Sequence, residues 1–528
     1  MNHKALLRCY QVSNRTEDSV FEEKLEPLLG STADPVAAGW QLRQLAESVE
    51  GQGALLIEEI ASQPDMVSAS DPAILGGILR VMHTVVLQAG PEVVSKVEPS
   101  HLQKIMEVLP PKTTNRFLVL QLLAMIRSED ALGRLVFLLE EMPPSQWIEA
   151  AQVLSPLMQH EDWSIDVVYP ALLDSLQHAA LASPVLDLAN YLFREGRTET
   201  HQASERLPML NHLLGEVSGR LSLFEENPRA FGDDVETVQA TLGEAVALAV
   251  SLCDTVGLIG DETSIGKLNQ TIELRHRRVQ CEAAGALAKL GDDNGKKRLL
   301  ALTEDPAARL RAIHYADEIG IGDQVNEDDR GEKATAEAEM ALWLTQPQQM
   351  GVPPTSVEVI DQRRLLWPSY NDPIDVYLVR FEYNMGERTY SNVGMTGPVC
   401  FAMSTDVANL PVDDIYAIYA GWHVEHEEIF TVAADQFNDA QQRAMETFSK
   451  HLEHNGYRSM KPVMLGIFLD EQAGLFTALR ETTECVVITD NLETIDRPIS
   501  GRLRPLSADD LFNLYKGRKM LRTFNSQS

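Results

Sequence analysis

The sequence predicts a mostly α-helical protein, in which an N-terminal α-solenoid of helix pairs precedes a C-terminal α+β domain with an antiparallel sheet. Three observations support this prediction. Apolar stretches of helical period follow one another from about residue 35 to residue 343, separated by short breakers. One motif within that part returns after 29 residues. Beyond about residue 356 the apolar period becomes alternating, as in β-strands.

Start and stop signals mark the helices of the first part. Asp71 and Pro72 suit the N-cap and first position of a helix that stops at Gly90. Further helices are expected over residues 117–126, 129–142, 147–159 and 233–257. A single hydrophobic core stops growing near about 250–300 residues, whereas stacked repeats need to contact only their neighbours. A run of helices of this length therefore predicts a solenoid rather than a bundle.

The repeat is clearest between residues 265 and 320. The segments 279–291 and 308–320 place Ala283 against Ala312, and Gly291 against Gly320, each 29 apart (312 − 283, 320 − 291). Small residues let helices pack closely, and a Gly can end a helix in a left-handed conformation. The spacing predicts one helix pair copied along an axis.

The motif VQCEAAGALAKLGDD resembles the HEAT-like repeat of the phycobilisome-lyase type, whose core is V-R-x-E-A-A-x-A-L-G-x-L-G-D. The resemblance covers about residues 265–320, and helix rhythm alone extends it toward residue 35. The sequence departs from the pattern at Gln280, where Arg is usual, and at Ala288, where Gly is usual. The resemblance implies a curved scaffold that holds proteins, and in some members nucleic acid or a chromophore.

Three parts follow from this pattern: a HEAT-like α-solenoid over residues 1–320, a charged and Pro/Gly-containing linker with a short helix over 321–355, and an α+β domain over 356–528. In the last part, strands are expected over residues 375–385, 387–403, 463–469, 474–481 and 485–490, and helices over 411–428, 434–454 and 507–522. The close turns between the last three strands predict an antiparallel meander.

Composition bounds the function. The chain has 528 residues, with 45 Lys and Arg against 78 Asp and Glu, and a net charge of −33. Its hydrophobic content of 44% is ordinary for a globular protein with a real core. Such acidity disfavours coating of nucleic-acid phosphates or of an anionic membrane surface. We expect other proteins as partners, no membrane, and nucleic acid only as a lesser alternative.

Five scattered cysteines form no CxxC pair: Cys9, Cys253, Cys281, Cys400 and Cys485. This pattern disfavours a disulfide framework or a cysteine-based zinc module, and it favours a reducing compartment. The start of the chain has too short an apolar core before Arg8 for a secretory signal. No uncharged apolar run reaches the roughly 18–20 residues that cross a bilayer. A soluble, cytoplasmic protein is expected.

Two His-x-Glu-His motifs are the strongest candidates for chemistry. His423 and His426, like His451 and His454, would lie at i and i+3 on one helical face, a spacing that metal ligands use. In a helical hairpin, however, the two pairs would be offset by roughly 15 Å at about 1.5 Å per residue, too far apart to share an ion. We therefore assign no metal, cofactor or catalytic residue, and retain a candidate surface of Trp422, His423, His426 and Glu427.

Two other segments of the C-terminal part have ordinary structural interpretations. The stretch from Ser391 to Pro398 is glycine-containing but lacks the Lys and hydroxyl of a phosphate-binding loop, so a hairpin turn or bulge is expected. Cys400 lies in an apolar strand and is expected in the core.

One region is locally basic: Arg275, Arg277, Arg278, Lys296, Lys297 and Arg298. On a solenoid these residues could form one face that binds nucleic acid. The alternative, which we favour, is that such cations brace neighbouring repeats or pair with the surplus of acid, as is also expected of Arg309 and Arg311.

The function that this sequence predicts is a non-enzymatic interaction scaffold built on helical repeats, with a C-terminal domain that binds a ligand or partner. One alternative is an enzyme whose active site lies within residues 356–528. Another is nucleic-acid binding through the basic face of residues 275–311. A deep pocket around residues 391–428 would favour the enzyme, and a filled core would favour the scaffold.

Overall fold

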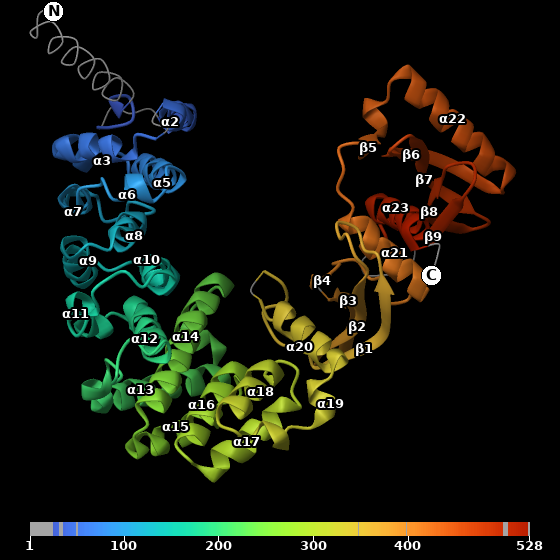
Figure 1. Ribbon diagram of the computed structural model, residues 1–528. Helices are drawn as coiled ribbons and strands as arrows, with labels where there is room; N and C mark the ends of the chain where they lie inside the picture. Colours follow the sequence, from blue (N-terminus) through green and yellow to red (C-terminus); the bar gives the residue numbers. More distant parts are fainter. Residues whose placement is uncertain are drawn as a thin grey trace, which may run out of the picture. The chain divides into compact units, whose positions relative to one another are not determined.

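The computed structural model describes residues 25–30, 35–48, 51–346, 348–397, 399–499 and 505–525. The expectations for Cys9 and for the start of the chain lie outside these residues. Contacts divide the chain into two compact units, Met1–Lys297 and Arg298–Ser528. As predicted, the described residues are mostly helical, with a long helical first part and a later region that contains antiparallel sheets (Figure 1).

Unit 1 consists of successive helices, and its described residues contain no strand. The helices are α2 (Pro35–Ser48), α3 (Gly53–Ser62), α4 (Pro64–Ala69), α5 (Pro72–Gln88), α6 (Pro91–Val94), α7 (Pro99–Val108), α8 (Phe117–Ile126), α9 (Glu129–Glu141), α10 (Trp147–Gln159), α11 (Ile165–Val168), α12 (Ala179–Arg194), α13 (Leu207–Glu226), α14 (Val235–Ile259), α15 (Ile265–Thr271), α16 (Arg277–Lys289) and the start of α17 (Asp293–Thr303). Short 3₁₀ turns, including η1 (Ala171–Gln177), join some of them.

The helices of unit 1 form two layers. In the first layer, contacts run from α5 to α8, α10, α12, α14 and α16 in turn. In the second layer α7 contacts α9, α9 contacts α11 and η1, and α13 contacts α15. Pairs such as α8 with α9, α13 with α14 and α15 with α16 join the two layers. Each helix thus buries its apolar side mainly against sequence neighbours, which is how an α-solenoid is built.

The predicted caps are present. The Asp71 side chain accepts hydrogen bonds from the backbone N–H groups of Ala73 (2.9 Å) and Ile74 (3.2 Å), with Pro72 at the first helical position. The helix over 233–257 continues to Ile259 instead of stopping at Gly257. A Cβ at Gly257 would lie 3.0 Å from Ala286, so this glycine allows α16 to approach α14 closely rather than ending the helix.

Helices α16 and α18 (Arg309–Glu318) end in the same way, at the repeated glycines. Gly291 (φ +84°) and Gly320 (φ +76°) are left-handed, and the next residue bonds back five positions, from Asp292 N to Leu287 O (3.0 Å) and from Ile321 N to Ala316 O (2.8 Å). This is the Schellman motif. Helix α12 ends identically at Gly196 (φ +65°), where Arg197 N bonds Leu192 O at 3.0 Å.

Among the described residues, α14 alone is long and apolar enough, by length and composition, to cross a membrane. Its most apolar window is 56% buried inside the protein. It contacts α12, α13 and α16, and it carries Asp254, which is ion-paired with Arg194. These contacts are those of a core helix.

Unit 2 combines helices with two antiparallel sheets. Its helices are α18, α19 (Glu327–Arg330), α20 (Glu332–Leu344), α21 (Val412–His423), α22 (Asp439–His454) and α23 (Ala508–Asn525). The first sheet has the order β1 (Ser356–Leu365), β2 (Ile374–Met385), β3 (Arg388–Thr396), β4 (Phe401–Ala402). The second has the order β5 (Ile429–Ala433), β6 (Tyr457–Phe468), β7 (Glu471–Arg480), β8 (Thr483–Thr489), β9 (Thr494–Pro498).

The helices and sheets of unit 2 alternate in layers. Helix α20 packs on one face of the first sheet, where Met340 and Leu344 share a core with Tyr377 and Val379. The α21–α23 pair shares a core with the opposite face of that sheet and with one face of the second sheet. Helix α22 covers the remaining face of the second sheet. The sequence predicted one sheet, whereas the structure has two. The strands β1, β5 and β9 were not predicted.

The compact units divide within α17, between Lys297 and Arg298. The limits expected from the sequence, at residues 320 and 355, stay a prediction. Within unit 2, the short helix expected in the linker is α20, and it packs on the first sheet. Arg309 is buried and donates to the carbonyls of Thr303 (3.0 Å) and Ala334 (2.8 Å). These bonds are consistent with the bracing role expected for this arginine.

Candidate functional site

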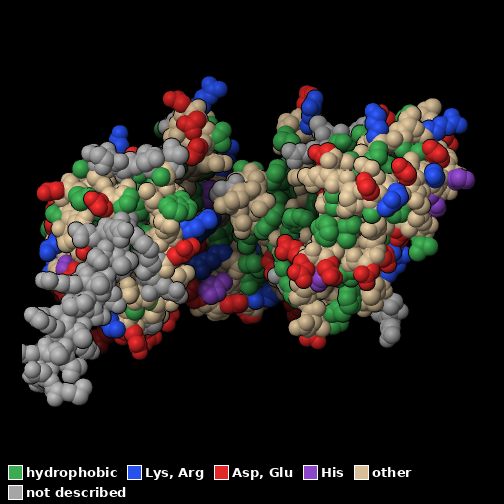
Figure 2. Space-filling model, turned by 90° about the horizontal axis from the view of Figure 1, so that it is seen from above, with side chains coloured by type: hydrophobic (Ala, Val, Ile, Leu, Met, Phe, Trp, Pro, Cys, Tyr) green, Lys and Arg blue, Asp and Glu red, His purple; other side chains and the backbone are tan. Residues whose placement is uncertain are grey.

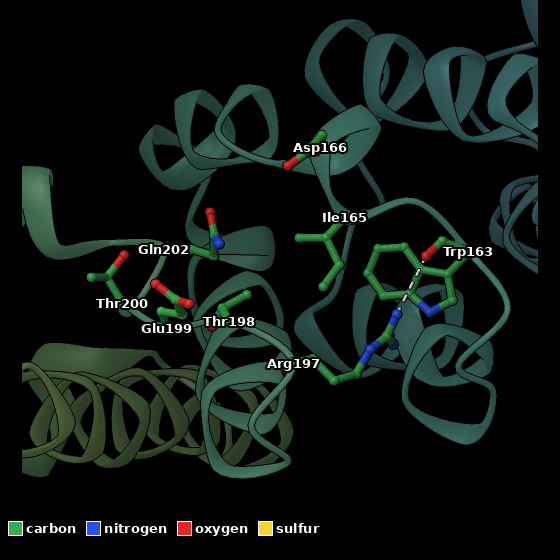
Figure 3. A pocket seen from close by; sticks show the side chains of 8 residues that line it. All are labelled: Trp163, Ile165, Asp166, Arg197, Thr198, Glu199, Thr200 and Gln202. Carbon is green, nitrogen blue, oxygen red and sulfur yellow. Dashed lines mark hydrogen bonds between the residues drawn. The ribbon is translucent and has the colours of Figure 1, made fainter.

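A cavity of about 460 Å³ in unit 1 opens to solvent between α11, the segment before it and the loop that follows α12 (Figure 3). We call it the Trp163 cavity. It is lined by Trp163, Ile165, Asp166, Arg197, Thr198, Glu199, Thr200 and Gln202. Its wall thus combines two apolar side chains with hydroxyl, amide, carboxylate and guanidinium groups.

Trp163 and Arg197 form the fixed part of the wall. The buried indole Nε1 of Trp163 donates to the carbonyls of Leu157 (3.0 Å) and His160 (2.9 Å), which sets the ring at the end of α10. The Arg197 guanidinium stacks over that ring, with Cζ 4.8 Å from the ring centroid. Its Nη2 donates to the carbonyls of Glu161 (3.0 Å) and Trp163 (3.3 Å). Arg197 is therefore held by a cation–π contact and two hydrogen bonds.

The backbone explains why Arg197 lies there. The left-handed turn at Gly196 ends α12, and the bond from Arg197 N to Leu192 O fixes the direction in which the chain leaves the helix. A residue with a Cβ would be strained at this φ of +65°. The left-handed turn at Gly196, of the same kind as those that end α16 and α18, thus directs Arg197 toward Trp163.

The far end of the loop is anchored by His201. This residue is 3% exposed, and its Nδ1 accepts from Ala203 N at 3.1 Å, so Nε2 carries the proton that is donated to Asn190 Oδ1 at 2.9 Å. Burial lowers the pKa of His201 to about 4, with opposing effects from Asp254 and Arg194. The imidazole is therefore neutral at physiological pH, and it holds its neighbours Thr200 and Gln202 at the cavity.

Asn190 continues this network into the α12–α14 contact. Its Nδ2 donates to Asp254 Oδ2 at 3.1 Å, and its Oδ1 is 2.9 Å from the Thr255 hydroxyl. Arg194 binds both Asp254 oxygens, one of them at 2.7 Å. We call His201, Asn190, Arg194, Asp254 and Thr255 the His201 network. The network couples the cavity loop to the core of the array.

Two polar atoms of the cavity residues lack partners. Arg197 Nη1 and Thr198 Oγ1 are shielded from solvent and have no hydrogen-bond partner among the residues that the structure describes. A buried donor without an acceptor costs about 1–3 kcal/mol, so native proteins rarely leave one unpaired. A carbonyl, carboxylate or water that enters the cavity and reaches these atoms after a small side-chain movement would satisfy them.

The charged groups of the cavity lining are two carboxylates and one guanidinium. Its lining contains no thiol or imidazole, and the described residues hold no group of three His, Cys, Asp or Glu that could bind a metal ion. Asp166 and Glu199 are exposed at the cavity. Hydrogen-bonding groups around a tryptophan suit recognition of a polar chain.

The candidate surface of the C-terminal domain is divided between a helix end and a loop. Helix α21 stops at His423, because Val424 is extended, so the predicted helix over 411–428 is five residues too long. His426 and Glu427 lie in the loop that follows, and His426 Nδ1 accepts from the N–H of Glu428 at 3.1 Å. The two histidines therefore do not share a helical face.

His423 and Trp422 belong to an aromatic cluster. His423 Nδ1 accepts from Trp367 Nε1 at 3.1 Å, and its ring stacks on Phe401 at 4.3 Å. Burial lowers the pKa of His423. Trp422 is 45% exposed, with its ring 5.3 Å from that of Phe401. The space between Trp367 and Phe401 has a volume of about 10 Å³, room for about one water molecule, and mostly apolar side chains line it.

Two neighbouring segments have a structural role. Ser391 to Thr396 belong to β3, so this stretch is a strand rather than the expected turn, and Pro398 lies outside the described residues. Cys400 is partly buried beside α20, its thiol 3.7 Å from the Glu339 carbonyl, and burial raises its pKa to about 12. Cys400 thus lies at the edge of the core beside α20 and just before β4, rather than within a core strand as expected.

The six residues of the predicted basic face are placed on α16, on α17 and just before α16. Arg275 N donates to Glu225 Oε1 at 2.5 Å, and Arg277 donates to Gln280 Oε1 at 2.9 Å. Lys296 is 3.7 Å from Asp293, whereas Arg275, whose bond comes from its backbone N–H, and Arg278, Lys297 and Arg298 are exposed.

Sequence reasoning missed the Trp163 cavity. Trp163 and Arg197 are 34 residues apart (197 − 163) and belong to different helix pairs. The available signal was the polar segment EGRTETHQ between two long apolar helices, which is longer and more polar than a simple turn requires.

No protein-family model matches the chain, and no curated protein matches it. A solved chain from work on lipid–protein interactions in lipovitellin aligns over 81% of this chain and 49% of its own length, with 13% identity and a TM-score of 0.28. This chain thus spans about half the length of that lipovitellin chain. A likeness of this degree carries no argument about function.

Proposed function

We propose that this protein is a soluble, cytoplasmic, non-enzymatic scaffold, in which an array of HEAT-like repeats holds a partner polypeptide and the C-terminal unit binds a further partner or ligand. The observation that carries the proposal is the two-layer helical array of unit 1, with a polar, solvent-open cavity built into its loops. Stacked repeats of this kind expose long surfaces without a central active site.

The surface is consistent with protein partners. Figure 2 shows acidic and basic side chains over the visible face, with hydrophobic side chains exposed between them. Large apolar side chains are exposed on several helices of unit 1, among them Trp40 (64%), Phe137 (49%) and Ile148 (50%). Aromatic and aliphatic side chains within a polar surround are common anchors of protein interfaces.

The structure offers less support for an enzyme or for a nucleic-acid-binding protein. For an enzyme, the region of residues 391–428 would need a pocket with converging polar groups, whereas the space found there has a volume of about 10 Å³. For nucleic-acid binding, the basic residues would need to be free to meet phosphates, and Arg277 and Lys296 each lie against a partner side chain. Both alternatives therefore rank below the scaffold.

Site-specific cross-linking tests the proposal. A photo-reactive amino acid is placed at Thr200, which is exposed at the cavity, and in a matched sample at Glu140, which is exposed on α9. The full chain is illuminated in a lysate of its native cells. We expect a reproducible set of polypeptides joined at Thr200 and not at Glu140. A monodisperse protein that joins no polypeptide at either position contradicts the proposal.

A further inference from the structure

We propose that the Trp163 cavity binds a segment of extended polypeptide that presents a Lys or Arg side chain. This inference rests on the proposed function and names the chemical class of the partner. The carboxylates of Asp166 and Glu199 would receive the cationic head group. The hydroxyl, amide and guanidinium groups of Thr200, Gln202 and Arg197 would bind the peptide backbone.

The charge of the cavity favours a cation. Asp166 and Glu199 are both exposed, and neither makes an ion pair or side-chain hydrogen bond with any residue that the structure describes. The cation among the lining residues, Arg197, is already committed to the Trp163 ring and to two carbonyl oxygens. These partners are uncharged and leave the positive charge of Arg197 in place, so the three charged lining residues carry a net charge of −1 (−2 + 1).

The neighbourhood increases this bias. Two arginines of unit 1 are paired with other carboxylates, Arg127 with Asp162 at 2.8 Å and Arg206 with Asp174 at 2.7 Å, so their charges do not offset those of the lining carboxylates. The whole chain carries a net charge of −33, which accelerates encounters with basic partners and slows those with acidic ones. The same charges disfavour a nucleic-acid backbone in this cavity.

The uncharged part of the wall favours a polypeptide over a bare cation. Thr200 and Gln202 provide both donors and acceptors, which match the alternating N–H and C=O groups of an extended chain. Arg197 Nη1 and Thr198 Oγ1, both without a partner, could bind a peptide carbonyl after a small movement. Trp163 and Ile165 provide apolar surface for the aliphatic stem of Lys or Arg.

Fluorescence anisotropy on the full chain tests the inference. The probe is a fluorescein-labelled octapeptide of alternating Lys and Ala, and the comparison ligands are the Glu–Ala octapeptide and spermine. The cavity variant is Asp166→Asn with Glu199→Gln. The matched control is Glu140→Gln with Glu141→Gln, which removes the same charge from exposed positions on α9.

We expect the cavity variant to bind the Lys–Ala peptide about tenfold more weakly, equivalent to about 1.4 kcal/mol, and the control to change affinity less than about twofold. We also expect the Glu–Ala peptide and spermine to bind at least about tenfold more weakly than the Lys–Ala peptide. An equal loss in both variants, or no loss in the cavity variant, overturns the assignment to this cavity.

If the Glu–Ala peptide binds as tightly as the Lys–Ala peptide, the cavity does not select a basic ligand. If spermine binds as tightly as the Lys–Ala peptide, the ligand need not be a polypeptide. These results separate the inference from the proposed function. If polypeptides are cross-linked at Thr200 but the Lys–Ala peptide does not bind, the scaffold proposal is retained and the basic ligand is rejected. Failure of cross-linking at every position rejects the scaffold itself.

Discussion

Two helix pairs, α12 with α14 in unit 1 and α21 with α23 in unit 2, are joined by different means. Between α12 and α14, polar side chains make the contact: Ser183 lies 2.8 Å from Ser251, and Asn190 donates to Asp254 at 3.1 Å. Between α21 and α23 the backbones themselves meet. A Cβ at Gly517 would overlap the Ala417 carbonyl, and a Cβ at Gly421 would overlap that of Asn513.

The difference determines what each contact tolerates. Side chains can adopt another rotamer or accept a water molecule when a neighbour changes, whereas a backbone contact can yield only if a whole helix moves. A polar network also contains titratable groups, so its stability depends on pH. We therefore expect the α21–α23 contact to fail abruptly on small changes, and the α12–α14 contact to weaken gradually and with pH.

The largest expected effect is that of Gly517→Ala. One added methyl must displace α23 from α21 within the core shared by both sheets, which should destabilise unit 2 by about 4 kcal/mol or more. Urea unfolding, followed by circular dichroism and tryptophan fluorescence, measures the loss. Gly219→Ala is the control, because Gly219 is exposed within α13 and a Cβ there meets nothing within 4 Å. It should stabilise the protein by up to about 1 kcal/mol. A cost below about 1 kcal/mol for Gly517→Ala would show that the backbone contact is not limiting.

Asp254→Ala tests the other contact. Asp254 is 9% exposed, and its removal leaves Arg194 without this carboxylate and Asn190 Nδ2 with the longer bond to the Ser251 carbonyl (3.4 Å) alone of its two acceptors. Because solvent can hydrate the partly exposed Arg194, the loss should cost about 2 kcal/mol in the free energy of unfolding. Asp174→Ala breaks the exposed pair with Arg206, with side chains 54% and 43% exposed, and should cost less than about 1 kcal/mol. Equal costs would contradict a special role for the His201 network.

The pH dependence of unit 1 should contain two opposing contributions. His201 has a pKa of about 4 when folded, below the ordinary 6.5, so the unfolded chain binds the extra proton and stability is lost as pH falls from about 6.5 to 4. For this buried imidazole the loss between pH 7 and pH 5 should be about 2 kcal/mol. Loss of hydration raises the pKa of Asp187 to about 6, although part of the residue is exposed to solvent. The protonated Asp187 therefore stabilises the folded protein at low pH, and this stabilisation is lost as pH rises from about 4 to 6.

Single variants separate the two contributions. In the wild type, His201 makes the unfolding free energy increase with pH between pH 4 and pH 6, so this increase should be smaller in His201→Asn. Asp187 makes the unfolding free energy decrease with pH, so the increase should be larger in Asp187→Asn. Urea unfolding at a series of pH values provides the measurement. A slope equal to that of the wild type in both variants would show that neither group has a pKa that differs between the folded and the unfolded chain.

Much of this architecture could be predicted from the sequence, because it depends on local chemistry. The cap at Asp71 and the left-handed glycines at 291 and 320 are determined by side-chain and backbone preferences of a few neighbouring residues. The imperfect alternation of Val376, Leu378, Phe381 and Tyr383 with polar positions predicted the strand β2 correctly, although the first two lie in one core and the last two in another.

What could not be predicted depends on tertiary contacts. Strand β1 is half-exposed along its length and carries charged side chains on both faces, so it lacks the alternation that marks a strand. Gly257 is a residue type that often ends helices, but α16 packs against it and α14 continues to Ile259. The Trp163 cavity requires two helix pairs to be stacked before its lining residues meet. No local pattern predicts such a meeting.

The smallest expected effect is that of removing two hydroxyls from the α12–α14 contact. In Ser183→Ala with Ser251→Ala, both partners of the 2.8 Å contact become methyl groups of similar size, so no buried hydroxyl is left unpaired and the cost should be about 1 kcal/mol. The Asp187 carboxylate also loses the hydrogen bond from Ser251 at 2.6 Å, which favours its ionised form.

The pKa of Asp187 should therefore rise further in this double variant, and its stabilising effect should extend to higher pH. Urea unfolding gives the cost, and NMR titration of the Asp187 carboxyl carbon gives the pKa. Ser155→Ala, which removes a hydroxyl bonded within α10 to the Gln152 carbonyl, is the control and should change neither quantity appreciably. If the double variant were as damaging as Gly517→Ala, polar side chains would be no more tolerant than touching backbones. A pKa of Asp187 that stayed constant would show that the serines pack in this contact without solvating the carboxylate.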